Sequence, residues 1–499
     1  MLGTKMLRSL LRTKSLDAIL SDGQAPEHQL KRALGSFDVV MLGIGAIIGA
    51  GIFATIGTAA AGDASRPGAG PALILSFVVT AVACGFAALC YAEFAAMVPI
   101  SGSAYTYSYA TLGELIAWII GWDLIIEYAV GNVAVAISWG NYFKTLVSGF
   151  GIVIPDWLST DYRTAAKIPG LFESAPHIFG IPIVVNLLAI GIVALVTIVL
   201  VIGIRESAST TTAMVILKLI VLGLFVAVGF GYVRTENWRP FAPNGWAGVQ
   251  AGAAIVFFAY IGFDAVSTVA EEVRDPKRDL PIGIIGSLII CTVIYIIVAM
   301  VFTGIIPYNV LVGKLATEQA EPLTMALQYA NIERWGDFFV GVVAFGSVVA
   351  HTAVLLVFQL GQPRIFFSMA RDGLLPPSFA RVHPKYRTPY VTTILTGVAV
   401  GVCAMFTSID EMVDLTNIGT LFAFILVCIG ILVLRKREPN RPRGFSTPFV
   451  PWVPMLGVIS CLYLMLGLPW VTWIRFGLWL ALGLVIYFLY GFKRSGLAR

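Results

Sequence analysis

The sequence has 499 residues, of which 58% are hydrophobic and only 12% are charged. An average soluble protein carries about twice that charged fraction. The composition therefore excludes a chain built only of soluble domains and indicates a protein embedded in a membrane. The net charge of +5 calls for no nucleic acid partner, because the basic excess lies in loops such as residues 435–443.

Several kinds of site are also excluded by the sequence. The six cysteines fall in apolar segments without a CxxC pair, and the four histidines lack the spacing of metal ligands. The sequence contains no GxxxxGK[ST] phosphate-binding loop. It also has no histidine and acid pair, and no nucleophile with a base at helical spacing. We therefore expect no metal, no cofactor and no enzymatic activity.

Long apolar runs recur along the chain after a polar tail at residues 1–37, and each suffices for the roughly 20 residues that cross a bilayer as a helix. Lysine and arginine concentrate in the loops on the side of the two termini, which the positive-inside rule places in the cytoplasm. We expect a multi-pass protein of the cell membrane, surrounded by lipid, with both termini cytoplasmic. The twelve predicted spans lie at about 38–61, 71–98, 112–140, 181–203, 209–231, 248–270, 282–306, 336–360, 389–407, 412–434, 450–469 and 473–492.

The first span has glycines clustered in its middle, at Gly43, Gly45, Gly49 and Gly51. Each glycine weakens a helix by about 1 kcal/mol relative to alanine. One explanation is close helix packing, which small residues four apart permit in lipid. The other is a discontinuous helix, whose unwound backbone is tolerated at that depth only where it lines a cavity.

Five spans later the sequence IVFFAYIGFDAVST at 255–268 places Gly262 in mid-membrane beside an ionisable Asp264. Paired interruptions at matching positions of two halves indicate an inverted-repeat transporter with its site at the bilayer midplane. Half-helix N-termini suit a carboxylate, and unwound carbonyl groups suit an ammonium group. The two breaks therefore predict a zwitterion site, for which an α-amino acid is the smallest common ligand.

Three ionisable side chains within the spans are candidates for proton coupling. Lys218 is flanked by apolar residues for about two turns, and an uncharged amine is favoured by such burial, so Lys218 can act as a proton carrier. Asp264 is its expected partner. Glu127 in the third span can line the substrate or proton route, or can form a hydrogen bond between helices. The alternative for Lys218 is a permanently charged lysine in an ion pair.

Several segments resemble the amino acid, polyamine and organocation permeases, and among them the bacterial permeases called cationic amino acid transporters. The resemblance extends from about residue 36 to about residue 494. It implies an all-α fold of the leucine-transporter type, with twelve transmembrane helices and discontinuous helices 1 and 6. A ten-helix core at 38–434 would comprise inverted repeats at about 38–231 and 248–434, followed by two peripheral helices and a short cytoplasmic C-terminus at 435–499. The matching segments are GIGAIIGAGIF at 43–53, CYAEFAAMVPISGSAYTY at 90–107, FFAYIGFDAVSTVAEEVRDPKRDLPIGI at 257–284, GQPRIFFSMARDGLLP at 361–376 and LTNIGTLFAF at 415–424.

The resemblance also implies which residues bind substrate. The carboxylate would meet the backbone amides of Ala50 and Gly51. The amino group would meet backbone carbonyls, and Phe258 would also cover the substrate. These carbonyls belong to Ile47, Phe258, Ala259 and Ile261.

The side-chain end of the substrate would face Gly131 and Phe358. A bulky phenylalanine there favours small or apolar amino acids, whereas relatives that carry cationic substrates are expected to have a hydroxyl group. We therefore expect a proton-coupled symporter of an L-amino acid that works by alternating access. The alternatives are a cationic amino acid transporter, an exchanger of amino acids or amines, and a non-transporting amino acid receptor. A small accessory membrane subunit remains an open possibility for partners.

Overall fold

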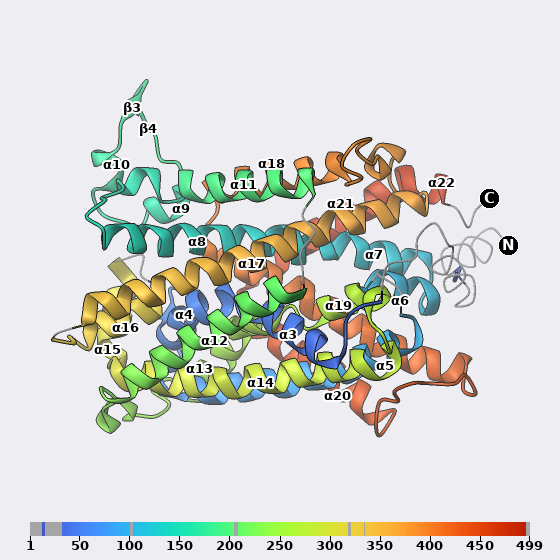
Figure 1. Ribbon diagram of the computed structural model, residues 1–499, viewed down its shortest axis with the longest axis horizontal. Coiled ribbons are helices and arrows are strands. Elements are labelled where there is room, and N and C mark those ends of the chain that lie inside the picture. Colours follow the sequence, from blue (N-terminus) through green and yellow to red (C-terminus); the bar gives the residue numbers. More distant parts are fainter. Residues whose placement is uncertain are drawn as a thin grey trace.

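The computed structural model describes residues 12–14, 32–99, 103–203, 208–317, 321–333 and 335–495. Its helices run mostly along the long axis of the molecule (Figure 1). Within these ranges, nine helical stretches are long and apolar enough to cross a membrane: Ser36–Ala61, Gly70–Met97, Glu114–Ser148, Thr212–Phe230, Gly245–Glu272, Pro276–Ile305, Gly336–Arg371, Ile409–Arg437 and Trp470–Arg494. Three shorter apolar helices accompany them: Leu187–Ile202, Tyr390–Phe406 and Trp452–Met465.

The first part of the chain alternates long helices with short connecting elements. Its α-helices are α3 (Ser36–Ile47), α4 (Ile56–Ala61), α5 (Leu73–Met97), α6 (Ser103–Thr111), α7 (Glu114–Ile125), α8 (Gly131–Ser148), α9 (Tyr162–Ala165), α10 (Leu171–Ser174), α11 (Leu187–Ile202) and α12 (Ala208–Phe230). Turns of π-helix lie at Gly51–Thr55 and Ile126–Val130, and 3₁₀ turns at Gly70–Ala72 and Asp156–Leu158. Two antiparallel hairpins pair β1 (Gly62–Asp63) with β2 (Arg66–Pro67), and β3 (His177–Ile178) with β4 (Ile181–Pro182).

The second part has longer helices. They are α13 (Gly245–Val256), α14 (Pro276–Ile305), α15 (Tyr308–Thr317), α16 (Pro322–Tyr329), α17 (Gly336–Arg371), α18 (Tyr390–Phe406), α19 (Ile409–Arg437), α20 (Trp452–Met465), α21 (Trp470–Ile486) and α22 (Phe492–Arg494). The 3₁₀ segments are Thr235–Trp238, Phe257–Tyr260, Asp264–Glu272 and Pro377–Ala380, and a π-helical turn lies at Tyr487–Gly491.

Within the described residues, each of the twelve predicted spans coincides with a helix or a run of consecutive helical segments, and nine of these stretches are long and apolar enough to cross a membrane. The largest difference is α17, which was expected to end near residue 360 and continues to Arg371, with Pro363 inside it. The apolar run stops at residue 361, but a helix can continue into water where its polar residues are solvated. Hydropathy therefore locates the spanning part of a helix better than it locates the end of that helix.

The outer surface of several helices is apolar. Ile198 of α11, Val293 of α14, Val398 of α18 and Leu478 of α21 are each more than half exposed. In water such a surface would be a large unfavourable patch, whereas hydrocarbon chains accommodate it without cost. The exposed apolar side chains and the helix lengths together define a multi-pass membrane protein.

The two ends of the described chain meet at Glu114, at the start of α7. The backbone amide of Glu114 donates to the carbonyl of Arg12 at 2.9 Å. Its carboxylate accepts from the hydroxyl groups of Ser495 and Tyr487, the latter at 3.0 Å. Both described ends therefore lie at the same end of the bundle, near α6 and α22 in Figure 1.

The opposite end of the bundle carries α10, α15, α16 and the hairpin β3–β4 (Figure 1). The other hairpin, β1–β2, is bound to α19 through Arg66. The guanidinium group of Arg66 lies 2.9 Å from the carboxylate of Asp63 and 2.8 Å from that of Asp414. Burial raises the pKa of Asp63, but the charge of Arg66 and hydrogen bonds from Ser65 outweigh it, so the pKa is lower than usual. The salt bridge between Asp63 of β1 and Arg66 of β2 is therefore ionic near neutral pH.

Glu93, near the C-terminal end of α5, holds the segment after α19. Its buried carboxylate accepts two hydrogen bonds from Arg435, at 2.8 and 2.9 Å, and one from Arg443 at 3.0 Å. The amide of Thr447 donates to it as well, at 2.8 Å. One carboxylate thus joins α5, α19 and the following loop.

We expect Glu93→Gln to lower the free energy of unfolding by about 3 kcal/mol, because removing one partner of a buried ion pair leaves the other charges uncompensated. Melting in detergent by intrinsic fluorescence measures this change. Glu411→Gln is the matched control, since its partners Arg163 and Arg475 are partly exposed and exposed pairs contribute less than about 1 kcal/mol. Equal melting temperatures for the two variants would contradict the role given to Glu93.

Candidate functional site

The first membrane-spanning stretch is interrupted near its middle. Helix α3 ends at Ile47, and Ile48 takes an extended conformation with φ −75° and ψ 103°. A π-helical turn begins at Gly51 and leads into α4. The discontinuity that the glycine cluster predicted is therefore present in the structure.

The second interruption lies where α13 ends at Val256. A 3₁₀ segment, Phe257–Tyr260, is followed by Ile261 with ψ 135° and by Gly262 with φ 119°, in a region that favours glycine. The chain then continues as 3₁₀ helix through Asp264–Glu272. This confirms the second predicted break.

The two breaks touch each other through their glycines. A Cβ atom added at Gly51 would lie 2.2 Å from the Cα atom of Ala259. One added at Gly262 would lie 2.7 Å from the carbonyl oxygen of Ala46. Both positions must therefore lack a side chain for the two unwound segments to lie in contact.

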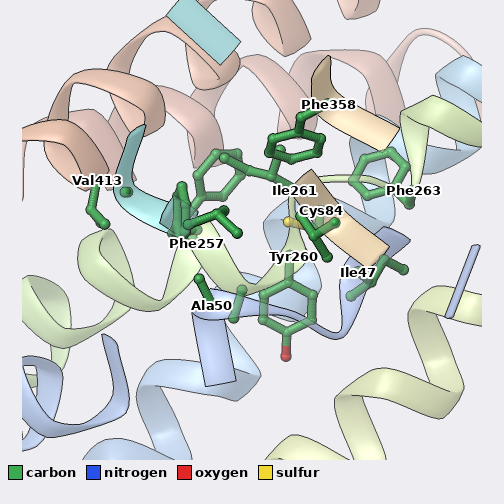
Figure 2. Close-up of a cluster of buried hydrophobic side chains, with 14 of the residues drawn as sticks. Ile47, Ala50, Cys84, Phe257, Tyr260, Ile261, Phe263, Phe358 and Val413 are labelled. Carbon is green, nitrogen blue, oxygen red and sulfur yellow. The ribbon is translucent and has the colours of Figure 1, made fainter. Parts of the chain in front are cut away.

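Figure 2 shows the residues around this contact as one buried cluster, with Ile47 and Ala50 from the first break and Ile261 from the second. Phe358 of α17 belongs to the same cluster (Figure 2). The eight proposed substrate-binding residues are all buried: Ile47, Ala50, Gly51, Gly131, Phe258, Ala259, Ile261 and Phe358. The region is thus closed to solvent in this arrangement.

The carbonyl groups freed by the first break have side-chain partners. The ammonium group of Lys218, on α12, donates to the carbonyls of Gly45 at 2.7 Å and Ile48 at 2.9 Å. These groups belong to the C-terminal end of α3, where the helix dipole is negative and carbonyls lack partners within the helix. The positive charge of Lys218 therefore compensates the negative end of the α3 dipole and gives its carbonyl groups a hydrogen-bond donor.

Tyr295 on α14 connects the two breaks. Its hydroxyl group lies 3.0 Å from the carbonyl oxygen of Ile47 and 2.9 Å from that of Ala259. Both carbonyls were expected to face the substrate amino group. A carbonyl oxygen has two lone pairs, so each of them keeps one acceptor position beside the tyrosine.

The expected pairing of Lys218 with Asp264 is wrong. Among the described residues, no ion pair within 4 Å joins them, and Lys218 is bound to backbone carbonyls instead. Asp264 accepts from the amide of Gly262 at 3.3 Å, and its side chain interacts with that of Glu127 on the π-helical turn after α7. The ammonium group is bound by the carbonyls at the end of α3 because these carbonyls have no donors within the helix and lie at its negative end.

Glu127 and Asp264 form a buried acidic pair surrounded by hydroxyl groups. Both side chains are buried and they interact with each other. One oxygen of each carboxyl group has no hydrogen-bond partner within the described part of the chain. The same holds for four hydroxyl groups, those of Tyr91, Tyr107, Tyr128 and Thr420.

The side-chain end of the proposed pocket is narrow. A Cβ atom added at Gly131 would lie 3.2 Å from the ring of Phe358 and 3.3 Å from the methyl group of Thr416. The ring of Tyr128 meets that of Phe358 edge-on, with centroids 5.7 Å apart. The structure thus brings Gly131 and Phe358 together and adds Thr416, which was not expected from the sequence.

The fold and these contacts define a class of protein, a multi-pass helical membrane protein whose two interrupted spans cross at a buried, backbone-lined centre. The model of the amino acid permease family matches residues 34–489. The chain therefore belongs to the amino acid permease family. This membership indicates a transporter rather than an enzyme.

Three relatives illustrate the range of this similarity. A branched-chain amino acid permease of Bacillus subtilis (strain 168) is 47% identical over 99% of this chain and 100% of its own length. A methylthioribose transporter of the same bacterium is 43% identical over 98% of this chain and 99% of its own length. The vacuolar cationic amino acid transporter 4 of Arabidopsis thaliana is 37% identical over 87% of this chain and 68% of its own length.

Proposed function

We propose that this chain is a secondary active permease of the cell membrane that moves a small or apolar L-amino acid together with a proton. It crosses the membrane twelve times, with a 5+5 inverted repeat at about 38–231 and 248–434 and both termini in the cytoplasm. The tail at 1–37 and the helices within 435–499 lie outside this core. The observation that carries the proposal is the contact between the two breaks, which puts free amides and carbonyls around one buried point.

The backbone supplies both halves of the recognition. The amides of Ala50 and Gly51 lie in the first turn after the break, where N–H groups have no partner within the helix and the dipole is positive. The second lone pairs of the Ile47 and Ala259 carbonyls suit an ammonium group, and the carbonyls of Phe258 and Ile261 complete that set. An α-amino acid carries a carboxylate and an ammonium group on the same carbon atom, so one molecule can engage both sets.

Proton coupling rests on Lys218. A charged ammonium group binds the carbonyls of Gly45 and Ile48 with hydrogen bonds about twice as strong as those of a neutral amine. Loss of the proton therefore loosens the tie between α12 and the end of α3, which allows the first half-helix to move. Glu127 and Asp264 take part by holding and passing the proton on the same side of the break.

Side-chain selectivity rests on Phe358 and Gly131. The ring and the neighbouring Thr416 leave an apolar surface, and the two nearby carboxyl groups, Glu127 and Asp264, interact with each other. Because the end of the pocket is formed by the Phe358 ring, we expect an apolar side chain to be preferred over that of lysine or arginine. The name of the branched-chain amino acid permease at 47% identity supports the same substrate class.

Counterflow in proteoliposomes tests the proposal. Vesicles loaded with unlabelled alanine, valine or leucine are expected to take up the labelled form of the same amino acid, and an imposed inward proton gradient is expected to drive accumulation. Absence of exchange with all twenty amino acids would reject the substrate class. Uptake of methylthioribose alone would reject it too, and would favour the function that the relative at 43% identity is named for. Exchange without accumulation under the proton gradient would indicate an obligate exchanger.

We expect Gly131→Ala to discriminate against larger substrates. The added methyl group would stand 3.2 Å from the ring of Phe358, so the pocket becomes shorter by about one methylene group. Competition of labelled alanine by unlabelled leucine should weaken by about tenfold, since one methylene group in an apolar pocket is worth 1–3 kcal/mol. Gly191→Ala, at a position with open space around it, should leave the ratio unchanged. An unchanged leucine to alanine ratio in Gly131→Ala would place the side-chain pocket elsewhere.

A further inference from the structure

Asn417 of α19 binds the end of the second half-helix. Its side-chain nitrogen donates to the carbonyls of Ala254 at 2.7 Å and Ile255 at 3.2 Å. These carbonyls belong to the last turn of α13, which stops at Val256 and so leaves its final carbonyls without their usual α-helical donors. The carbonyl of Ile255 also accepts from the backbone N–H of Phe257. Asn417 is fully buried, and leaving those carbonyls without a donor would cost about 1–3 kcal/mol each.

The arrangement repeats that of Lys218 at the first break. In both cases a side chain from another helix donates to two carbonyls at the end of an interrupted helix. Gly45 stands two residues before the last residue of α3, and Ala254 stands two residues before the last residue of α13. In the proposed repeat, α12 is the fifth helix of the first half and α19 is the fifth helix of the second. The two ties are therefore related by the same internal symmetry as the two breaks.

We propose that Asn417 is a positioning residue for transport, an uncharged counterpart of Lys218 that keeps the second half-helix fixed to α19 throughout the transport cycle. This inference rests on the proposed function. An amide group neither gains nor loses a proton between pH 4 and pH 10. The tie at α13 therefore persists when the tie at α3 is released, and the segment Phe257–Tyr260 keeps its position relative to α19 while the first half-helix moves.

Among the described residues, no hydrogen bond joins Asn417 to a titratable side chain near it. One turn earlier on α19, Asp414 is paired with Arg66. One turn later, Thr420 lies near Glu127, whose side chain interacts with Asp264. On α5, Tyr91 contacts Phe424 ring to ring. Within the described part of the chain, the side chain of Asn417 donates only to the two carbonyls of α13.

The test replaces the uncharged amide of Asn417 with a group that can lose a proton. Asn417→Asp keeps the shape of the side chain, and its protonated carboxyl group still offers one O–H donor to the carbonyls. Ionisation removes that donor and places a negative charge against two carbonyl oxygens. Counterflow of labelled leucine is measured with the same pH inside and outside the vesicles, from about pH 5.5 to about pH 8.5. The exchange rate of each variant is divided by that of the wild type at the same pH. The relative rate is expected to fall where the carboxyl group ionises, toward the alkaline end of this range.

We expect the relative exchange rate of Asn417→Asp to fall at least tenfold from the acid to the alkaline end. Asn186→Asp is the matched control, because Asn186 is also buried but accepts a hydrogen bond from the amide of Ala189 as a helix cap, a role that aspartate fills equally well. Its relative rate should be constant over the range. A constant relative rate for Asn417→Asp, with active wild type and control, would overturn the inference and leave the proposed function intact. Absence of exchange in the wild type would instead reject the proposed function.

A second pair of variants tests the inference if Asn417→Asp does not fold. Asn417→Ser keeps one neutral donor and Asn417→Ala keeps none, and neither titrates. We expect the serine variant to exchange at least fivefold faster than the alanine variant, with a ratio that does not depend on pH. Equal rates for monodisperse samples of the two would show that the donor has no part in transport.

Discussion

Lys218→Ala is expected to abolish accumulation of amino acid driven by a pH gradient. The ammonium group makes two hydrogen bonds to the end of α3, and charge-assisted bonds of this kind contribute about 1.5–3 kcal/mol each. A loss of about 3 kcal/mol in the state that requires the tie corresponds to roughly a hundredfold in rate. Initial uptake into proteoliposomes with an acidic exterior measures the effect.

Lys218→Gln separates the charge from the hydrogen bonds. Its amide offers neutral donors to the carbonyls of Gly45 and Ile48, but it does not gain or lose a proton near neutral pH. This variant should exchange substrate in counterflow more slowly than wild type and should not accumulate it under a proton gradient. Lys144→Ala is the control, because Lys144 pairs with Asp156 at the surface, and it should accumulate normally. Undiminished proton-driven accumulation by Lys218→Gln would remove Lys218 from the coupling mechanism.

The breaks were predictable from the sequence, whereas the side chains that stabilise them were not. Glycines clustered at 43–51 and Gly262 mark backbone that leaves the helix, and that signal is local. Tyr295 and Asn417 reach carbonyls more than 160 positions away along the chain, and nothing in their own segments distinguishes them from other polar residues in a span. Asn417 lies within the segment at 415–424 that resembles the permeases, but that resemblance assigned it no role.

The partner of Lys218 shows why charge pairing is hard to predict inside a membrane. Lys218 and Asp264 are opposite charges in neighbouring spans, and Coulomb attraction alone favours their pairing. A broken helix, however, presents several aligned carbonyl groups that act as a partial negative charge. The ammonium group of Lys218 binds these carbonyl groups, and the side chain of Asp264 interacts with that of Glu127 instead. The expected partner of Lys218 followed from formal charges, whereas the dipole of the half-helix was applied only to the substrate.

Gly51→Ala is expected to reduce transport by at least a hundredfold. The added Cβ atom would lie 2.2 Å from the Cα atom and 2.6 Å from the Cβ atom of Ala259. The first of these is a backbone atom, so the clash is relieved only if one broken segment moves away from the other. Overpacking of this kind costs about 1–3 kcal/mol in stability, and the separation also displaces the amides of Ala50 and Gly51 from the carbonyls of the second break. Counterflow with leucine and the melting temperature of the purified protein are measured together.

Two comparisons distinguish loss of the site from loss of the fold. Gly85→Ala in α5 adds a methyl group where no atom lies within 4 Å, so it should retain transport and gain up to about 1 kcal/mol from its higher helix propensity. The double variant Gly51→Ala with Ala259→Gly removes the contact between the two Cβ atoms but leaves the 2.2 Å contact with the backbone of residue 259. It should therefore melt at about the same temperature as Gly51→Ala, below wild type, and still fail to transport, because the two breaks cannot approach closely enough to enclose one zwitterion. Wild-type exchange by Gly51→Ala would show that the breaks work without touching and that the substrate binds elsewhere.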